Sequence, residues 1–135
     1  MSDRSLRILE IRPLIPSAKV SENMSTEEQF QNKTLRPVIK MQNSLLLVVF
    51  QNYFEQHKNR FYELSLSNRM LYIENAIQKD IKFRNSLTGI IIGQFTTEEY
   101  TLYIKSSSAL NKRMMQMVTE RIKDQLQYFE TSVLL

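Results

Sequence analysis

Residues 35–57, LRPVIKMQNSLLLVVFQNYFEQH, constrain the fold of the chain more than any other stretch. No glycine interrupts them, and Pro37 follows Thr34 closely enough to lie in a first helical turn, where its missing N–H group costs nothing. On periodicity alone, the run LLLVVF at 45–50 also suits a buried strand. About twenty residues without a breaker favour a helix instead. Apolar residues surround the middle of this stretch, which predicts a central helix over 35–57 with neighbours on several sides.

The chain as a whole is poor in turn-forming residues. Its 135 residues include two glycines and three prolines, with 42% hydrophobic and 24% charged residues. Sandwiches and barrels need many tight turns, and most of those turns use Gly or Pro. A chain of this length has room for one domain. The composition therefore predicts a single all-α domain.

Capping patterns and apolar stripes predict the remaining helices. Ser25 with Glu28, and Thr96 with Glu99, have the spacing of a capping box, in which side chains satisfy free N–H groups of the first turn. The expected helices cover about 26–32, 35–57, 67–84, 86–93, 97–105 and 108–130. We expect five or six helices in a compact, irregular bundle around 35–57 and 108–130.

Two segments have weaker patterns. Residues 1–24 contain clustered prolines and no sustained period, which predicts an extended or disordered N-terminal arm before a helical domain at 25–135. The sequence LTGIIIGQF at 87–95 is compatible with a strand, because consecutive isoleucines favour strands. We prefer a helix over 86–93 that ends at Gly93.

The residue types present exclude several kinds of chemistry. The chain has no cysteine, which removes disulfides, thiolate metal sites and cysteine nucleophiles. Its one histidine, His57, falls near the expected end of a helix, where we expect a cap or an exposed side chain. Zinc sites and serine triads need partners that this sequence does not cluster. The adjacent pairs Glu27–Glu28 and Glu98–Glu99 suit first helical turns, where they oppose the helix dipole. We predict no catalytic, cofactor-binding or metal-binding residues and no cofactor.

The hydropathy of the sequence bears on the location of the protein in the cell. The longest uninterrupted apolar run, 45–50, is far shorter than the roughly twenty residues of a membrane span. The first twenty residues lack the apolar core of a signal peptide. We therefore expect a cytoplasmic protein without membrane contact.

Four polar residues form a weak candidate site for an anion: Asp80, Lys82, Arg84 and Asn85. Asp80 and Arg84 have the i,i+4 spacing of an ion pair on one helix face, which is the interpretation we prefer. The functional alternative has Lys82 and Arg84 binding an anionic ligand or nucleic acid.

Three functions remain open. The first is protein–protein contact, including a homodimer, because Met115 and Leu47 fall outside the apolar stripes. The second is a nucleic-acid-associated module that uses residues 58–93, where six of the 18 basic residues lie. The third is a small-ligand-binding protein or enzyme with a pocket between helices. Such a pocket could be lined by four tyrosines: Tyr62, Tyr72, Tyr100 and Tyr103.

Three stretches resemble a known family. They are NKTLRPVIKMQNSLLLVVF (32–50), IENAIQKDIKFRNSLTGIIIGQFTTEEY (73–100) and NKRMMQMVTERIKDQL (111–126). Together they resemble a family of short helical bacterial proteins that often carry the label glyoxalase. Glyoxalase I enzymes are βαβββ proteins that hold a metal with histidines and glutamates. No such ligand position carries over to this chain, so the resemblance implies no glyoxalase activity.

Overall fold

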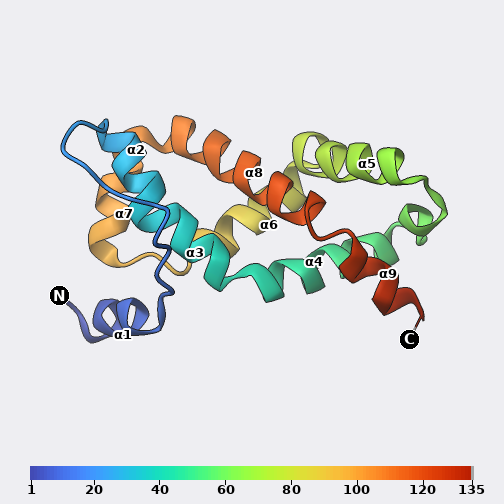
Figure 1. Ribbon diagram of the computed structural model, residues 1–135, viewed down its shortest axis with the longest axis horizontal. Coiled ribbons are helices and arrows are strands. Elements are labelled where there is room, and N and C mark those ends of the chain that lie inside the picture. Colours follow the sequence, from blue (N-terminus) through green and yellow to red (C-terminus); the bar gives the residue numbers. More distant parts are fainter. Residues whose placement is uncertain (135) are drawn as a thin grey trace.

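The computed structural model describes the backbone of residues 1–134 and the side chains of residues 1–130, and all regular structure in this part is helical. The helices are α1 (Asp3–Ile11), α2 (Thr26–Phe30), α3 (Arg36–Met41), α4 (Asn43–Gln56), α5 (Leu66–Lys79), α6 (Ile81–Ile92), α7 (Thr97–Tyr103), α8 (Ser107–Lys123) and α9 (Gln127–Leu134). The all-α prediction is confirmed. Figure 1 shows an elongated arrangement with α1, α2 and α7 at one end and α5 and α9 at the other.

The core lies between α8 and its neighbours. Helix α8 packs against α3, α5 and α6, so it has partners on several sides. The fully buried side chains of the core include Leu46, Phe50 and Phe54 of α4, Leu87 and Ile91 of α6, and Met114, Val118 and Ile122 of α8. Burying each such side chain contributes about 1.5–3 kcal/mol before entropy is counted. The predicted packing around 35–57 and 108–130 therefore holds.

The three longest predicted helices are each broken. The 35–57 helix divides at Gln42 (φ −86°, ψ 1°), whose side-chain amide donates to the Ile90 carbonyl at 2.9 Å. The 67–84 helix ends at Lys79, because Asp80 (ψ 94°) leaves the helical region and caps α6. The 108–130 helix divides between Lys123 and Gln127. Seven of the nine described helices have seven residues or more, so the number of full helices is close to the expected five or six. The two shorter helices, α2 and α3, are joined by a π-helical turn at Gln31–Leu35.

The prediction of an extended or disordered arm is wrong for Asp3–Ile11, which forms α1. The Ser2 hydroxyl accepts from the Ser5 N–H group and caps the helix. Ser5 and Ile8 are buried against the rest of the protein. Residues 12–25 lack a helix, as the prolines led us to expect. A short capped helix thus precedes the irregular segment.

Other local predictions are confirmed. Residues 87–92 are helical, and α6 ends at Ile92, directly before Gly93. Gly93 has a right-handed φ of −57°, so its left-handed freedom is not used. The capping box is complete: the Thr96 hydroxyl accepts from the Glu99 N–H group at 3.0 Å, and Glu99 accepts from the Thr96 N–H group at 2.8 Å. Within the described part of the chain, no helix is both long and apolar enough to cross a membrane.

Candidate anion-binding site

The structure separates the four residues of the predicted polar site. Asp80 and Lys82 line one hollow, whereas Arg84 and Asn85 line another. The predicted ion pair between Asp80 and Arg84 is wrong. Arg84 donates to the Gln78 carbonyl at 3.3 Å instead. The i,i+4 argument fails because Asp80 is the N-cap of α6, and its carboxylate oxygens accept from other donors.

Asp80 has two other partners. Its carboxylate accepts from the Phe83 N–H group at 3.1 Å and from the Tyr53 hydroxyl at 3.0 Å. These two hydrogen bonds, the first being the stronger influence, hold the pKa of Asp80 below its usual value. Burial, together with the hydrogen bond to Asp80 and its charge, raises the pKa of Tyr53 to about 12. At neutral pH Asp80 is therefore an acceptor and Tyr53 a donor, and the pair is suited to positioning rather than to proton transfer.

The four tyrosines proposed as a pocket lining do not line one common pocket, although the rings of Tyr100 and Tyr103 lie 5.7 Å apart. Tyr72 lines the same hollow as Asp80, and burial raises its pKa. Tyr62 packs against Phe54. Tyr103 is buried and donates to Asn111 at 2.5 Å, while Tyr100 is exposed. A pocket between helices exists, but these residues are not its common lining.

The hollow with the clearest chemistry lies between α3 and α8, and Ile15, Ser17 and Ala18 form part of its wall. Its volume is about 750 Å³. We call it the arginine hollow, because three arginines line it: Arg36, Arg113 and Arg121. Ile15, Ile39 and Met117 supply its apolar surface, and Asn32 and Gln125 add amide groups.

Helical spacing brings the arginines to one place. Arg113, Met117 and Arg121 follow one another at four-residue intervals, so they lie along one face of α8. Arg36 faces them from α3. At the far end of the hollow, Asn43 and Gln125 exchange two hydrogen bonds of 2.8 and 2.7 Å. The arginines of the hollow therefore lie on helices, whereas Ile15, Ser17 and Ala18 of the irregular segment complete its wall.

The three arginines lack carboxylate partners. Arg36 donates from Nε to the Asn32 side chain at 2.9 Å, and Arg113 donates from Nε to the Gln31 side chain at 3.3 Å. Among the described side chains, none of the three forms an ion pair, and the Arg121 guanidinium makes no hydrogen bond. All three are half-buried. Guanidinium groups are planar and carry several N–H donors, which suits them to binding anions.

Two carboxylates also belong to the lining, Glu120 and Asp124. Both residues are exposed, and in the described part of the protein neither comes within ion-pair distance of an arginine. The lining thus carries three positive and two negative charges, and the positive groups are the more buried ones. Guanidinium groups that keep free N–H donors can bind a phosphate or carboxylate in bidentate fashion.

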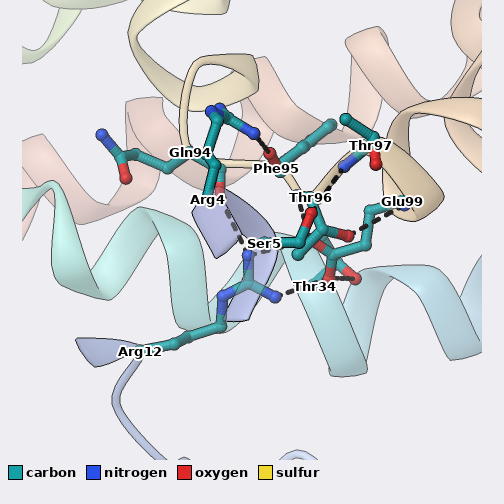
Figure 2. A network of polar contacts seen from close by, with 9 residues as sticks. All are labelled: Arg4, Ser5, Arg12, Thr34, Gln94, Phe95, Thr96, Thr97 and Glu99. Carbon is teal, nitrogen blue, oxygen red and sulfur yellow. Dashed lines mark hydrogen bonds and ion pairs between the residues drawn. The ribbon is translucent and has the colours of Figure 1, made fainter. Parts of the chain in front are cut away.

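A polar network at the α1 end holds the segment that borders this hollow (Figure 2). Arg12 donates to Glu99 from two nitrogens, at 2.5 and 2.9 Å, and to the Gln94 carbonyl at 2.8 Å. Glu99 also accepts from the Thr34 hydroxyl at 2.7 Å. The Arg12 and Glu99 side chains are only 6% and 12% exposed. We call Arg12, Thr34, Thr96 and Glu99 the Arg12 network.

The charge of Glu99 is maintained by these contacts. Burial by itself raises its pKa, but the hydrogen bonds from Arg12, the Thr96 N–H group and Thr34 outweigh burial and hold the pKa below its usual value. Glu99 therefore does more than oppose a helix dipole. It joins the capping box of α7 to the N-terminal segment, and three positions beyond Arg12 that segment reaches the arginine hollow at Ile15.

Sequence reasoning missed the arginine hollow for a clear reason. The pattern RMMQMVTER at 113–121 predicts the apolar stripe of a helix, and the two arginines flank that stripe. Arg36 lies in a different part of the sequence, so only the packing of α3 against α8 brings it close. His57 is exposed and follows the last residue of α4, as predicted. Among the described residues, no group of three or more His, Cys, Asp or Glu could hold a metal ion.

The resemblance to short bacterial proteins labelled glyoxalase stays a prediction. In comparisons with known proteins, no family model, no curated protein and no solved structure matches this chain.

Proposed function

We propose that this protein binds a small organic molecule through a phosphate or carboxylate group, in the arginine hollow. One observation carries the proposal: three half-buried arginines line one hollow, and no ion pair involves them among the described side chains. Arginines elsewhere in the chain, such as Arg12 and Arg69, do have carboxylate partners. Arg4, Arg60 and Arg84 also form no ion pair with a described residue, but the arginine hollow is where three such arginines line one concave surface.

Like charges held near one another repel, and a partly buried position weakens the screening by water. A bound anion offsets this repulsion and accepts hydrogen bonds from the guanidinium N–H groups. Each hydrogen bond between charged groups contributes about 1.5–3 kcal/mol. Three guanidinium groups therefore favour an anion with several oxygens.

The shape of the hollow supports an organic ligand over a bare ion. A volume of about 750 Å³ lies within the range of small-molecule sites, roughly 300–1,000 Å³. Ile15, Ile39 and Met117 offer apolar contacts beside the arginines. A ligand with a charged group at one end and an apolar body uses both kinds of surface.

Calorimetric titration tests the proposal with four probes: inorganic phosphate, phenyl phosphate, benzoate and the uncharged benzyl alcohol. We expect saturable binding of one equivalent of phenyl phosphate or benzoate, weaker binding of inorganic phosphate, and none of benzyl alcohol. Changing Arg36, Arg113 or Arg121 singly to Gln should weaken binding about tenfold or more, because each change removes a charge-assisted contact.

Lys105→Gln is the matched control, since it also removes one positive charge, from an exposed side chain outside the lining of the hollow. It should leave the affinity within about twofold of the parent at moderate salt, because the charge is screened beyond about 10 Å. Absence of saturable binding at millimolar concentration, or equal losses in the control and the arginine variants, excludes the proposal.

Contact with a second copy of the chain is a second candidate. Met115 and Leu47, which led to this expectation, are buried and do not support it. Helix α1 supports it instead, because Leu6, Leu9 and Ile11 are 49%, 42% and 67% exposed on a short helix. Light scattering should then give the mass of a dimer for the parent and of a monomer for Leu9→Glu. A monomeric parent at high concentration contradicts self-association.

A cytoplasmic location also stays a prediction from the sequence.

The nucleic-acid-associated module that the sequence suggests depends on the basic residues of 58–93. In the structure those residues face different surroundings: Arg69 pairs with Glu130, Arg84 lines one hollow, and Lys79 and Lys82 line another.

A further inference from the structure

A second hollow, of about 680 Å³, is formed by residues of α4, α5 and the start of α6. We call it the tyrosine hollow. Its lining combines aromatic groups with two lysines and an amide: Tyr53, His57, Tyr72, Asn75, Lys79 and Lys82. It shares no lining residue with the arginine hollow, so the two can be tested separately.

A stack of three rings ends in this hollow. Phe83, which is buried, stacks on Tyr53 with ring centroids 4.0 Å apart, and Tyr53 stacks on His57 at the same centroid distance. The Nδ1 atom of His57 lies 2.8 Å from the Tyr53 carbonyl oxygen, which fixes the orientation of the imidazole. His57 is exposed, and within the described side chains its other face has no ring partner. A flat aromatic ring can therefore continue the stack.

The cationic groups of the hollow are not neutralised. The Lys79 and Lys82 side chains are exposed and form no ion pair with any described residue. Asp80, the acid of the lining, already accepts from the Tyr53 hydroxyl with one oxygen and from the Phe83 N–H group with the other. Because both carboxylate oxygens already accept hydrogen bonds within the protein, the ammonium groups of Lys79 and Lys82 are the charged groups available to a ligand.

Polar groups beside the ring stack can contact the edge of a base. The Asn75 side chain is exposed and carries both a donor and an acceptor. The Tyr72 hydroxyl can donate a hydrogen bond, and burial raises its pKa further above neutral pH. These groups match the parts of a nucleotide. The His57 ring suits the face of a base, the amide and hydroxyl groups suit its edge, and the two lysines suit the phosphate.

We propose that the tyrosine hollow binds a nucleoside monophosphate unit, with its base stacked on His57 and its phosphate bound by Lys79 and Lys82. The unit is either a free nucleotide or one residue of a single strand, since both present the same base and phosphate. This site does not depend on the proposed function of the arginine hollow.

The single histidine makes the experiment direct, because the chain has one imidazole Hε1 signal in the NMR spectrum. Titration with AMP should move this signal upfield in a saturable way, through the ring current of a stacked base. Adenosine should produce the same direction of change at higher concentration, whereas inorganic phosphate should not shift the signal upfield.

Two sets of variants separate the two hollows. The double change Lys79→Gln and Lys82→Gln should raise the Kd for AMP at least tenfold and leave the Kd for adenosine within twofold. Arg113→Gln, which alters the arginine hollow, should leave the effect of AMP on His57 unchanged. Loss of that effect in Arg113→Gln, with an unaltered response in the lysine variant, would place AMP in the arginine hollow and overturn the inference.

A folded protein whose Hε1 signal does not move in millimolar AMP also overturns it. A six-residue oligoadenylate identifies the source of the ligand. Tighter binding than AMP, measured on the same signal, supports a single strand as the natural ligand. Equal or weaker binding supports a free nucleotide.

Discussion

Different interactions stabilise the two ends of the molecule. At one end, the Arg12 network joins residues that are 87 and 65 positions apart in the chain, through charged and neutral hydrogen bonds. At the other end, aromatic rings of α4, α9 and the turn at Arg60–Glu63 pack together: Phe54 and Phe61 stack with centroids 3.8 Å apart, and Phe129 lies 5.0 Å from Phe54. The first end depends on pairs of matched partners, whereas the second depends on buried area.

This difference has a consequence for the candidate site. Hydrogen bonds are directional, so the Arg12 network fixes where the N-terminal segment lies, and that segment borders the arginine hollow. Aromatic packing is less directional and contributes mainly to the free energy of unfolding. We therefore expect damage at the aromatic end to lower stability alone, and damage at the Arg12 network to lower both stability and anion affinity.

The largest expected effect is that of Phe61→Ala. Phe61 is fully buried and contacts the rings of Phe54 and Phe129, so the change removes buried area and leaves a cavity. We expect the free energy of unfolding, measured with urea, to fall by about 3–5 kcal/mol. In the folded protein, the affinity for phenyl phosphate should stay within twofold of the parent. Phe61→Leu is the control and should lower the free energy of unfolding by less than half as much.

The second effect is that of Glu99→Gln, which leaves the Arg12 guanidinium almost buried and without its carboxylate. Removing one partner of a buried ion pair costs about 3 kcal/mol, and the same urea titration measures it. The double change Arg12→Met and Glu99→Met should recover part of this loss, because no charge is then left unpaired. A loss below about 0.5 kcal/mol for Glu99→Gln contradicts a structural role for the pair.

The third effect is the pH dependence that distinguishes the two ends. The pKa of Glu99 in the folded protein lies below the unfolded value of 4.5, so the folded state favours the ionised form. This contribution to stability is complete above the unfolded pKa and is lost as the pH falls through the folded-state pKa. The stability difference between the parent and Glu99→Gln should therefore be constant at neutral pH and should shrink in acid. The difference between the parent and Phe61→Ala should not change over the same pH range.

Sequence patterns predict the helical class and much of the element order, because helical stripes and capping residues are local signals. The Thr96–Glu99 capping box is one example, since both residues lie within one turn. The breaks at Gln42 and Asp80 are less accessible to such reasoning. Gln42 makes a hydrogen bond to Ile90, and Asp80 binds Tyr53, so partners far along the chain stabilise both breaks.

The candidate sites are even less predictable, because each is made by packing. Asp80, Lys82 and Arg84 are close in sequence, but Lys82 and Arg84 are two positions apart on α6, so they point to different sides of that helix and line different hollows. Arg36 and Arg121 had no reason to be paired before α3 and α8 were placed together. Arg12 lay in a segment expected to be extended or disordered, and its buried carboxylate partner is 87 residues away.

The smallest expected effect sharpens the comparison within the N-terminal segment itself. Arg7 and Arg12 both form ion pairs with carboxylates, but the Arg7 side chain is 68% exposed and the Arg12 side chain only 6%. Arg7→Gln should change the free energy of unfolding by less than about 0.5 kcal/mol, since solvent screens its pairs, and should not change the affinity for phenyl phosphate. Arg12→Gln removes the same charge nearby, yet it should lower stability severalfold more and weaken phenyl phosphate binding, because residues 15–18 lose their anchor. Equal effects of the two changes would show that burial of the Arg12 pair does not position the wall of the arginine hollow.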